Sequence, residues 1–325
     1  MSRTRRSVLA STACAMAGTM LLTCAEAQPW PQRPLRIVVG FQAGGTGDVV
    51  ARLVADRLAP LLRASIVIEN RPGASGVTAA NSVRTSEDDH ALLMVSDTYV
   101  VTPLINRNAG FEIVRDFKLV GIVAEGPHVV VAAKGAPFKT FEEFARHAQS
   151  KGSGIDYATS GFGHPQHLIG EHLAAELPAR LVHLPTRGGS AAVNELLAGT
   201  LPLAILGLGP TFQLIQDGRL VPLAVSTAQR VPALPDVPTL TELGFGDFRA
   251  QQWLGLVASR TLSDERVSLL SKELAKALTD SAMRNKFDAL GLTPHFVDAS
   301  AMGARISEEQ TRWRSILAAA NLAAK

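Results

Sequence analysis

Short apolar runs alternate along the chain with longer segments whose apolar residues recur at helical spacing. The run at residues 35–39 (Leu-Arg-Ile-Val-Val) is followed by a glycine-rich loop and then by an amphipathic segment at 49–58. A second unit follows, with a strand expected at 65–69, a helix from 77 to about 85 and a strand at 91–95. Strands that alternate with helices at this spacing predict a parallel sheet in an α/β fold, with ligands beyond the carboxyl ends of the strands.

The chain changes character after residue 95. We expect a loop through Asp97, Thr98 and Pro103, a short strand at 119–124 and a domain boundary near Gly126-Pro127. Beyond this boundary the pattern predicts strands at 129–133, 155–158, 181–184, 203–206, 221–226 and 253–258, and helices at 140–150, 165–177 and 191–197. The strand at 155–158, the small-residue loop at 159–164 and the following helix therefore repeat the opening unit of the chain.

The last part of the chain is expected to be helical. From Ser263 onward apolar residues recur at helical spacing, and an amphipathic helix is expected near 301–322. A terminal helix of this kind usually packs back on the first domain. Thr140 stands where a hydroxyl can cap the helix at 140–150.

Residues 1–27 have the composition of an export signal. Arginines at positions 3, 5 and 6 precede an apolar run at 8–22, and Ala25-Glu26-Ala27 offers a cleavage site. The paired arginines also suit a twin-arginine signal, but we expect the general secretory route. Lipidation at Cys24 is a further possibility, although Thr23 before it fits such a site poorly.

Export would leave a mature chain without thiols. Both cysteines, Cys14 and Cys24, lie within the signal, so disulfides, thiolate metal sites and cysteine nucleophiles are excluded from the mature protein. Removal of residues 1–27 leaves 298 residues. It removes three arginines and one glutamate, so Lys+Arg falls from 32 to 29, Asp+Glu falls from 29 to 28, and the net charge is +1. This length suggests two domains, and the charge does not suit nucleic-acid binding. No later apolar stretch reaches the ~18 residues of a membrane span.

The loop at residues 40–48 (Gly-Phe-Gln-Ala-Gly-Gly-Thr-Gly-Asp) is the first candidate site. Gly44, Gly45 and Gly47 allow a tight turn and close approach of the backbone to a ligand. The first turn of the following helix offers unpaired N–H groups and a partial positive charge, which favour a carboxylate or phosphate. An ordinary strand-to-helix turn remains equally open from this stretch alone.

Phosphate and dinucleotide binding fit this loop poorly. Gly45-Thr46-Gly47 resembles part of a dinucleotide fingerprint, with Glu69 near the ribose-binding position, but Val50 occupies the third glycine position. A phosphate-binding Walker loop requires lysine where Thr46 stands. We therefore expect no cofactor.

Metal binding and nucleophilic catalysis are also weakly supported. His164, His167 and Glu171 have spacing that could hold zinc, but a loop histidine and a polar contact at the helix start explain them more simply, so no metal site is expected. Neither Ser160 nor Ser190 lies in a nucleophile elbow, and we expect no catalytic residue.

Arg187 is a cation in a glycine-rich turn after a predicted strand. Its guanidinium can bind a carboxylate through two parallel hydrogen bonds. A solvated surface arginine is the alternative.

An ordered series of segments resembles the Bug family, the extracytoplasmic solute-binding receptors of tripartite tricarboxylate transporters. The segments are residues 34–39 (Pro-Leu-Arg-Ile-Val-Val), Ala43-Gly44-Gly45 with Asp48, residues 69–76 (Glu-Asn-Arg-Pro-Gly-Ala-Ser-Gly), Tyr157-Ala158 with Ser160-Gly161 and His167, and residues 234–239 (Leu-Pro-Asp-Val-Pro-Thr). The series spans nearly the whole mature chain. Two departures stand out, namely Gly40-Phe41-Gln42 in place of a proline-aromatic-proline entry and Thr186 in place of a tyrosine.

The resemblance implies an α/β fold of the type II periplasmic-binding-protein kind, with two lobes and a ligand cleft between them. Residues 28–126 and 252–325 would form the first lobe and residues 127–251 the second. The protein would be a periplasmic monomer that captures a small carboxylate, delivers it to a two-component membrane transporter and performs no catalysis. The residues carried over as ligand-binding are Phe41, Ala43, Gly44, Gly45, Thr46, Asp48, Ser160, Gly161, His164, Thr186 and Arg187, with His167 as support.

Asp48 differs from the rest of this set, because an ionised carboxylate repels a bound carboxylate. It is expected to stabilise its own helix start, unless the ligand also carries a donor such as an amine or amide. Two other functions remain open, an exported α/β enzyme and a sensor's accessory subunit.

Overall fold

The structure is a computed structural model that describes residues 30–246 and 250–319. The expected export signal, residues 1–27, lies outside the described residues. Arg33–Lys325 form one compact unit, to which all the elements below belong. Its described strands form one mixed sheet in the order β2-β1-β3-β9-β4-β7-β5-β6, and β10 and β8 also pair with β4.

The first lobe has a parallel sheet at its start. Strand β1 (Leu35–Val39) pairs with β2 (Ile66–Asn70) on one side and with β3 (Ala91–Ser96) on the other, both in parallel. Helices α1 (Thr46–Leu62) and α2 (Val77–Arg84) connect these strands. The parallel sheet expected from the opening pattern is confirmed for these three strands.

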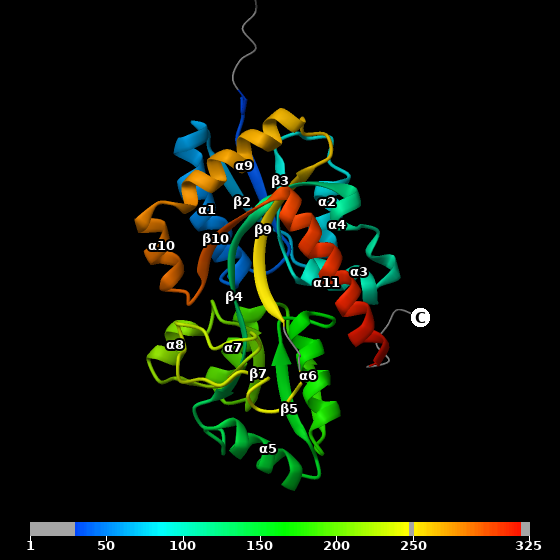
Figure 1. Cartoon of the computed structure of the whole chain (residues 1–325), viewed down its shortest axis with the longest axis vertical. Coiled ribbons are helices and arrows are strands. Elements are labelled where there is room, and N and C mark those ends of the chain that lie inside the picture. The colour runs from blue at the N-terminus through cyan, green and yellow to red at the C-terminus, as the bar shows by residue number, and fades with distance from the viewer. Residues whose placement is uncertain (1–29, 247–249, 320–325) are drawn as a thin grey trace, which may run out of the picture. The chain divides into compact units, whose positions relative to one another are not determined.

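Two antiparallel strands run between the lobes, and they make the sheet mixed where a parallel one was expected. They are β4 (Phe117–Ala133) and β9 (Gln251–Ser259), which Figure 1 shows between the upper and lower halves. Strand β4 pairs with β9 as far as Pro127, and from His128 onward it pairs with β7 and β8. The expectation of separate strands at 119–124 and 129–133 was therefore wrong, because Glu125, Gly126 and Pro127 stay paired with β9.

The second lobe repeats the strand-loop-helix pattern. Strand β5 pairs in parallel with β6 and with β7, and helices α5 to α8 belong to the same half of the chain (Figure 1). The elements are α5 (Phe141–Ser150), β5 (Ile155–Thr159), α6 (Pro165–Glu176), β6 (Leu181–Pro185), α7 (Gly189–Ala198), β7 (Leu203–Gly207), α8 (Phe212–Gln216) and β8 (Leu220–Val225). The Thr140 side chain accepts from the N–H of Glu143, so the expected cap of α5 is confirmed.

Two segments differ from the sequence-based expectation. The expected loop through Thr98 and Pro103 is helix α3 (Thr98–Ile105), which Asp97 caps by accepting from the N–H of Thr98. The short element η1 (Ala74–Gly76) precedes α2, and η2 (Arg107–Ala109) and α4 (Ile113–Asp116) follow α3. Strand β10 (Thr293–Asp298) was missed because Pro294 interrupts its pattern, and its register with β4 shifts between Pro294 and Val297.

The C-terminal helices cover the first lobe. They are α9 (Asp264–Leu278), α10 (Ser281–Asp288) and α11 (Ala299–Ala319). Helix α11 packs on α3, β4 and β10, so the expectation that the last helix returns to the first domain is confirmed (Figure 1). Among the described residues, no helix combines the length and the apolarity that crossing a bilayer requires.

A buried polar cluster joins α11 to the two crossing strands. Trp253 Nε1, on β9, lies 3.0 Å from both carboxylate oxygens of Glu309, and Arg305 Nε donates to Glu309 Oε1 at 3.0 Å. Arg305 also pairs with Glu125 of β4. Burial raises the pKa of the Glu309 carboxyl, although Trp253 and Arg305 stabilise its charged form. The cluster therefore holds both crossing strands against one helix.

Glu309→Ala should lower the free energy of unfolding by about 3 kcal/mol, because it leaves the buried Trp253 N–H and Arg305 without a shared acceptor. Urea unfolding of the variant and the wild type measures the difference. Glu308→Ala is the matched control, since Glu308 is exposed on the same helix. Equal unfolding midpoints for Glu309→Ala and the control would contradict the role of the cluster.

Candidate functional site

Three loops that follow parallel strands meet where the lobes face each other. Residues 40–45 join β1 to α1, residues 160–164 join β5 to α6, and residues 186–188 join β6 to α7. The first residues of α1 and α7, Thr46 and Gly189, line the same cavity. Because the first N–H groups of a helix lack an intrahelical acceptor, two helix starts offer donors and partial positive charge to this cavity.

This cavity, the inner chamber, draws its walls from both lobes. Residues from β1, α1, β3, α3 and β9 form one side, and residues from the 160–164 loop, α6, α7 and β7 form the other. Its polar lining consists of Thr46, Ser96, Thr98, Ser160, His164, Gln166 and Gln252. No Lys, Arg, Asp or Glu is among the described residues that line it.

A second cavity, the outer hollow, adjoins the inner chamber and shares Phe41 and Ser160 with it. Its lining includes Gly161, Thr186 and Arg187. Arg187 is exposed here. The cleft therefore has an interior without charged side chains and an outer part with one arginine.

His164 is the titratable group of the inner chamber. It is 2% exposed, and its Nδ1 lies 3.5 Å from Thr98 Oγ1 across the cleft. Its ring packs edge-on against Phe41 at a centroid distance of 5.2 Å. Burial, and to a lesser extent the neighbouring histidines, lower the pKa of His164 to about 3. His164 is therefore neutral at pH 7 and contributes hydrogen bonds without charge.

His167 lies behind the loop and lines neither cavity. Its ring stacks on His183 at 4.0 Å, and its Nδ1 accepts from the N–H of Gly163 at 3.2 Å. His167 Nε2 lies 3.4 Å from Glu171 Oε1. His164 and His167 thus face different surroundings, and His167 contacts the 160–164 loop from the side away from the cleft.

Asp48 is buried beneath the first loop and lines neither cavity. Its carboxylate accepts from the N–H of Gly44 at 3.0 Å, from Arg52 at 2.9 and 3.1 Å and from Asn70 at 2.9 Å. Burial alone would raise its pKa, but the hydrogen bonds from Arg52, Gly44 and Asn70 bring the pKa below its ordinary value. Asp48 therefore stays ionised and fixes the loop through Gly44, Arg52 and Asn70, rather than through the N–H groups of its own helix start as expected.

The twelve proposed residues divide into three groups by position. The inner chamber is lined by Phe41, Gly45, Thr46, Ser160 and His164. The outer hollow is lined by Gly161, Thr186 and Arg187, together with Phe41 and Ser160. The remaining four residues line neither cavity, namely Ala43, Gly44, Asp48 and His167.

Four polar residues of the inner chamber were missed by the sequence-based prediction. Ser96 ends strand β3 and Thr98 follows it, so the rule that ligands lie beyond the carboxyl ends of parallel strands could have found them. Gln166 opens α6 and accepts from the N–H of Ser160 at 2.9 Å. Gln252 had no local signal, because it reaches the cavity from the returning strand β9.

The two serines singled out by the sequence do not form a nucleophile-base pair in the described part of the chain. Ser190 Oγ donates to the carbonyl of Ala43 at 3.3 Å. Among the hydrogen bonds of the described residues, neither Ser160 nor Ser190 has a histidine partner. This arrangement supports ligand binding better than acyl transfer.

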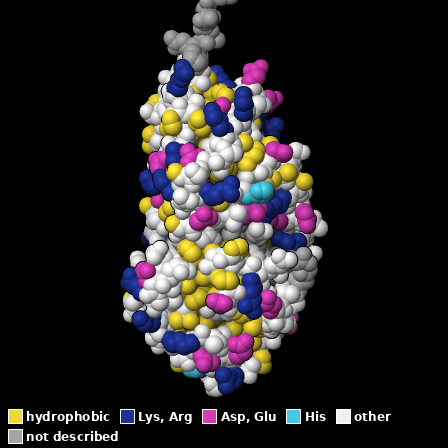
Figure 2. Space-filling model, turned by 60° about the vertical axis from the view of Figure 1, so that its left-hand side comes forward, with side chains coloured by type: hydrophobic (Ala, Val, Ile, Leu, Met, Phe, Trp, Pro, Cys, Tyr) yellow, Lys and Arg dark blue, Asp and Glu magenta, His cyan; other side chains and the backbone are white. Residues whose placement is uncertain are grey.

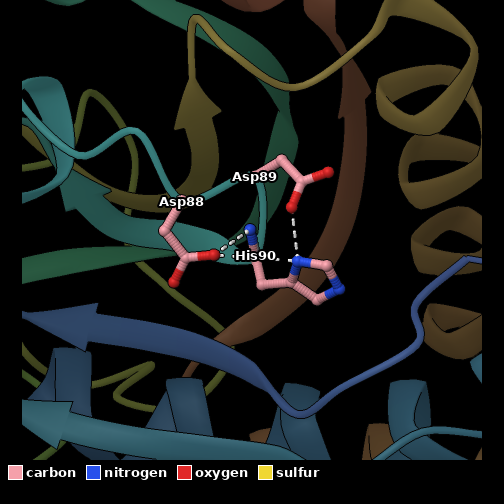
Figure 3. A group of neighbouring side chains, drawn as sticks. All are labelled: Asp88, Asp89 and His90. Carbon is pink, nitrogen blue, oxygen red and sulfur yellow. Dashed lines mark hydrogen bonds and ion pairs between the residues drawn. The ribbon is translucent and has the colours of Figure 1, made fainter.

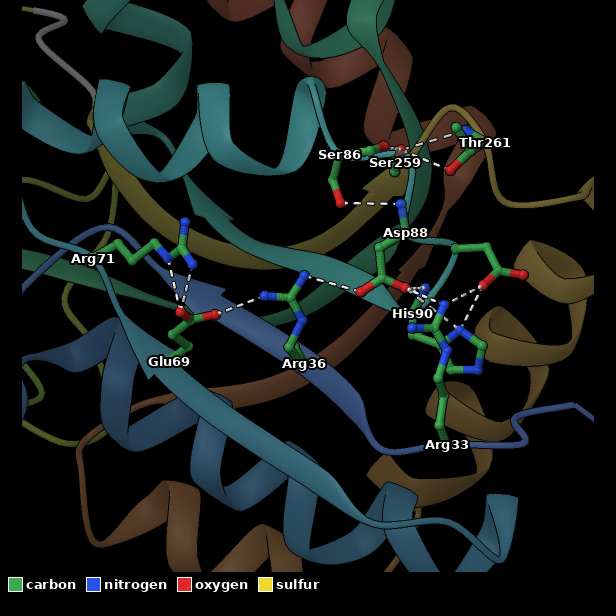
Figure 4. Close-up of polar contacts among 10 residues, drawn as sticks. Arg33, Arg36, Glu69, Arg71, Ser86, Asp88, His90, Ser259 and Thr261 are labelled. Carbon is green, nitrogen blue, oxygen red and sulfur yellow. Dashed lines mark hydrogen bonds and ion pairs between the residues drawn. The ribbon is translucent and has the colours of Figure 1, made fainter.

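Away from the cleft, Asp88, Asp89 and His90 form a cluster with the ligand types of a metal site (Figure 3). Arginines already neutralise its carboxylates. Arg33 and Arg36 donate to Asp88 at 2.8 and 3.0 Å, as Figure 4 shows, and Arg266 pairs with Asp89. The cluster is therefore an ion-pair network between β1, the 85–90 loop and α9, and it offers a cation little free negative charge.

The surface carries charges of both signs. On the face in Figure 2, Lys and Arg side chains are interspersed with Asp and Glu side chains and form no single basic stripe. This distribution does not suit a nucleic-acid interface.

Asp48→Asn should lower the free energy of unfolding by about 1 to 2 kcal/mol at pH 7, because the charged hydrogen bonds are lost. The folded-state pKa of Asp48 lies below the unfolded value of about 3.9, so its stabilisation is present above that pH and lost as the pH falls through the folded-state pKa. Urea unfolding from pH 7 to pH 3 should therefore show a difference that shrinks toward acid. Asp56→Asn, at an exposed position of α1, is the control, and a difference that does not depend on pH would contradict this account.

Known proteins share both the sequence pattern and the fold. The model of the family described as "Tripartite tricarboxylate transporter family receptor" matches residues 50–322. The solved structure of the periplasmic binding protein BugD is 29% identical, with a TM-score of 0.87 over 91% of this chain and 100% of that one. A Rhodopseudomonas palustris protein solved with adipate is 28% identical, with a TM-score of 0.87 over 91% of this chain and 100% of that one.

MatC from the same organism, solved with bound malate, is 27% identical, with a TM-score of 0.82 over 89% of this chain and 100% of that one. These proteins bind solutes in the periplasm or hold a dicarboxylate in their solved structures. The match covers most of the chain and both lobes of the fold. The chain therefore belongs to the tripartite tricarboxylate transporter receptor family, the Bug family of periplasmic solute-binding proteins.

Proposed function

We propose that this protein captures a small organic carboxylate in the periplasm and delivers it to a tripartite tricarboxylate-type membrane transporter. The observation that carries the proposal is the convergence of two helix starts, at Thr46 and Gly189, on one chamber between the lobes. Backbone N–H groups at a helix start bind carboxylates without a neighbouring cation. Relatives with bound adipate and malate support this class of ligand.

The cleft suits a ligand that carries an acid group at each end. One carboxylate would occupy the inner chamber, where Thr46, Ser160 and neutral His164 supply hydrogen bonds. The other end would extend into the outer hollow toward Arg187, whose guanidinium can bind a second carboxylate. Burying an anion in the inner chamber costs desolvation free energy, and the chamber has no charged side chain to offset it. The helix N–H groups and the hydroxyl groups must therefore replace the hydrogen bonds that the anion loses from water.

The lobe boundaries remain part of the proposal. We assign residues 28–126 and 252–325 to the first lobe and residues 127–251 to the second. The change of β4 partner between Pro127 and His128 supports this division. Closure of the lobes would then bend the chain near these residues and at the start of β9.

Export through the general secretory route, the monomeric state and delivery to a two-component transporter belong to the same proposal. They follow from residues 1–27 and from the family. Catalysis is not part of it, since the related proteins bind solutes and neither Ser160 nor Ser190 has a histidine partner among the described hydrogen bonds.

A ligand screen tests the proposal directly. Ligand at a hundredfold excess over its Kd stabilises the folded state by about 2.7 kcal/mol, so the correct acid should raise the melting temperature by several degrees. The screen should include adipate, malate, tricarboxylates, amino acids and their amides. If no compound raises the melting temperature and native mass spectrometry finds no small acid in the purified protein, the proposed function is contradicted.

Arg187→Ala should weaken binding of a dicarboxylate about fivefold, because it removes a charge-assisted contact at a solvent-exposed position. Isothermal titration with the acid found in the screen measures the change. The melting temperature without ligand should stay unchanged, as it should for Arg219→Ala, an exposed arginine of the same lobe. Equal affinity in wild type and Arg187→Ala would remove Arg187 from the site.

A further inference from the structure

The loop at residues 73–76 has a backbone conformation that its residues do not explain. All four have positive φ, at 152° for Gly73, 45° for Ala74, 54° for Ser75 and 91° for Gly76. Glycine adopts such angles at little cost, but alanine and serine are disfavoured there by about 1 kcal/mol or more each. Strain of this kind persists where the surrounding structure fixes it, and it concentrates at functional sites.

The first lobe holds this loop in place. The N–H of Gly76 donates to the carbonyl of Gly73 at 3.0 Å, and Thr102 Oγ1 donates to the carbonyl of Ser75 at 3.3 Å. A Cβ at Gly76 would lie 2.8 Å from the Tyr99 ring, so the backbone is closely packed at this point. Within the first lobe, a glycine at position 75 would satisfy the same geometry with less strain.

The hydroxyl of Ser75 has its partner in the other lobe. Ser75 Oγ donates to the carbonyl of Phe162 at 2.8 Å, in the loop that connects β5 to α6. The neighbouring Gly163 packs against Ile105 of α3, whose side chain would have to move to make room for a Cβ at position 163. Direct contact between the lobes at this end of the cleft therefore centres on Ser75.

This contact borders both cavities of the cleft. Ser75 and Phe162 line the outer hollow, and His164 of the same 160–164 loop lines the inner chamber. The hydrogen bond forms only when the 160–164 loop lies against the first lobe. The hydrogen bond thus favours the arrangement in which residues of both lobes line the inner chamber.

We propose that Ser75 is a positioning residue that holds the two lobes closed through its hydrogen bond to Phe162, and so sets how tightly the protein retains its ligand. This inference rests on the proposed function for its effect on ligand affinity. The closed arrangement itself is a property of the two lobes and can be measured without ligand.

Two substitutions separate the hydroxyl from the backbone strain. Ser75→Ala removes the hydrogen bond and keeps the strained backbone, whereas Ser75→Gly removes the hydrogen bond and relieves the strain. Both should lower the ratio of closed to open protein about two- to fivefold, the range for one partly exposed hydrogen bond. The melting temperature of Ser75→Gly should not fall below that of the wild type, because relief of strain offsets the extra freedom of glycine in the unfolded chain.

Single-molecule energy transfer between the lobes gives the readout without ligand. The mature chain from residue 28 has no cysteine, so Glu87→Cys in the first lobe and Gln149→Cys in the second allow site-specific labelling at exposed positions. Ser82→Ala is the matched control, because Ser82 Oγ donates to Ala79 within its own helix at 2.8 Å. Titration with adipate and with malate then measures the effect on affinity.

The expected result is a lower closed-to-open ratio in both Ser75 variants and an unchanged ratio in Ser82→Ala. An acid that binds should show a Kd raised by the same factor in both Ser75 variants. A wild type that stays open without ligand, or Ser75 variants with the wild-type ratio, would overturn the inference. Absence of binding by any acid would count against the proposed function alone, since the ratio without ligand still decides the role of Ser75.

Discussion

The antiparallel pairing of β4 with β9 is the interaction on which the rest of the structure depends. These two strands run between the lobes, and β4 changes partners from β9 to β7 and β8 on the way. Glu309 and Arg305 of α11 attach both strands to one helix through Trp253 and Glu125. The pairing places the loops of the two lobes opposite each other, and β9 brings Gln252 into the inner chamber.

Charge is distributed in the cleft so that the interior stays neutral. Asp48 is buried close to the first loop, but its carboxylate is engaged by Arg52 and by the N–H of Gly44, and these contacts also hold the loop rigid. His164 is kept uncharged by burial. The partial charges of helix starts then become the main electrostatic attraction for an anion, and Arg187 adds a full charge only in the outer hollow.

The sequence alone determined the local units and their chemistry. The strand-loop-helix repeats around residues 40–45 and 160–164, the cap at Thr140 and the ordered series of family segments were all recognisable, because periodicity, capping and turn residues act over a few positions. They indicated the two-lobed α/β fold and five residues that line the inner chamber. The helical state of the segment after Asp97 was not predicted, since Pro103 argued against it and packing against α11 is not encoded locally.

Only the tertiary structure decided how these units combine. It showed that β4 is continuous through Gly126 and Pro127, because pairing with β9 outweighs the local preference of glycine and proline for a turn. In the tertiary structure Asp48 lies outside the inner chamber, whereas Gln252 and Thr98 line it. Contacts between residues far apart in the chain depend on the path of the crossing strands, and no pattern within a short window of sequence specifies that path.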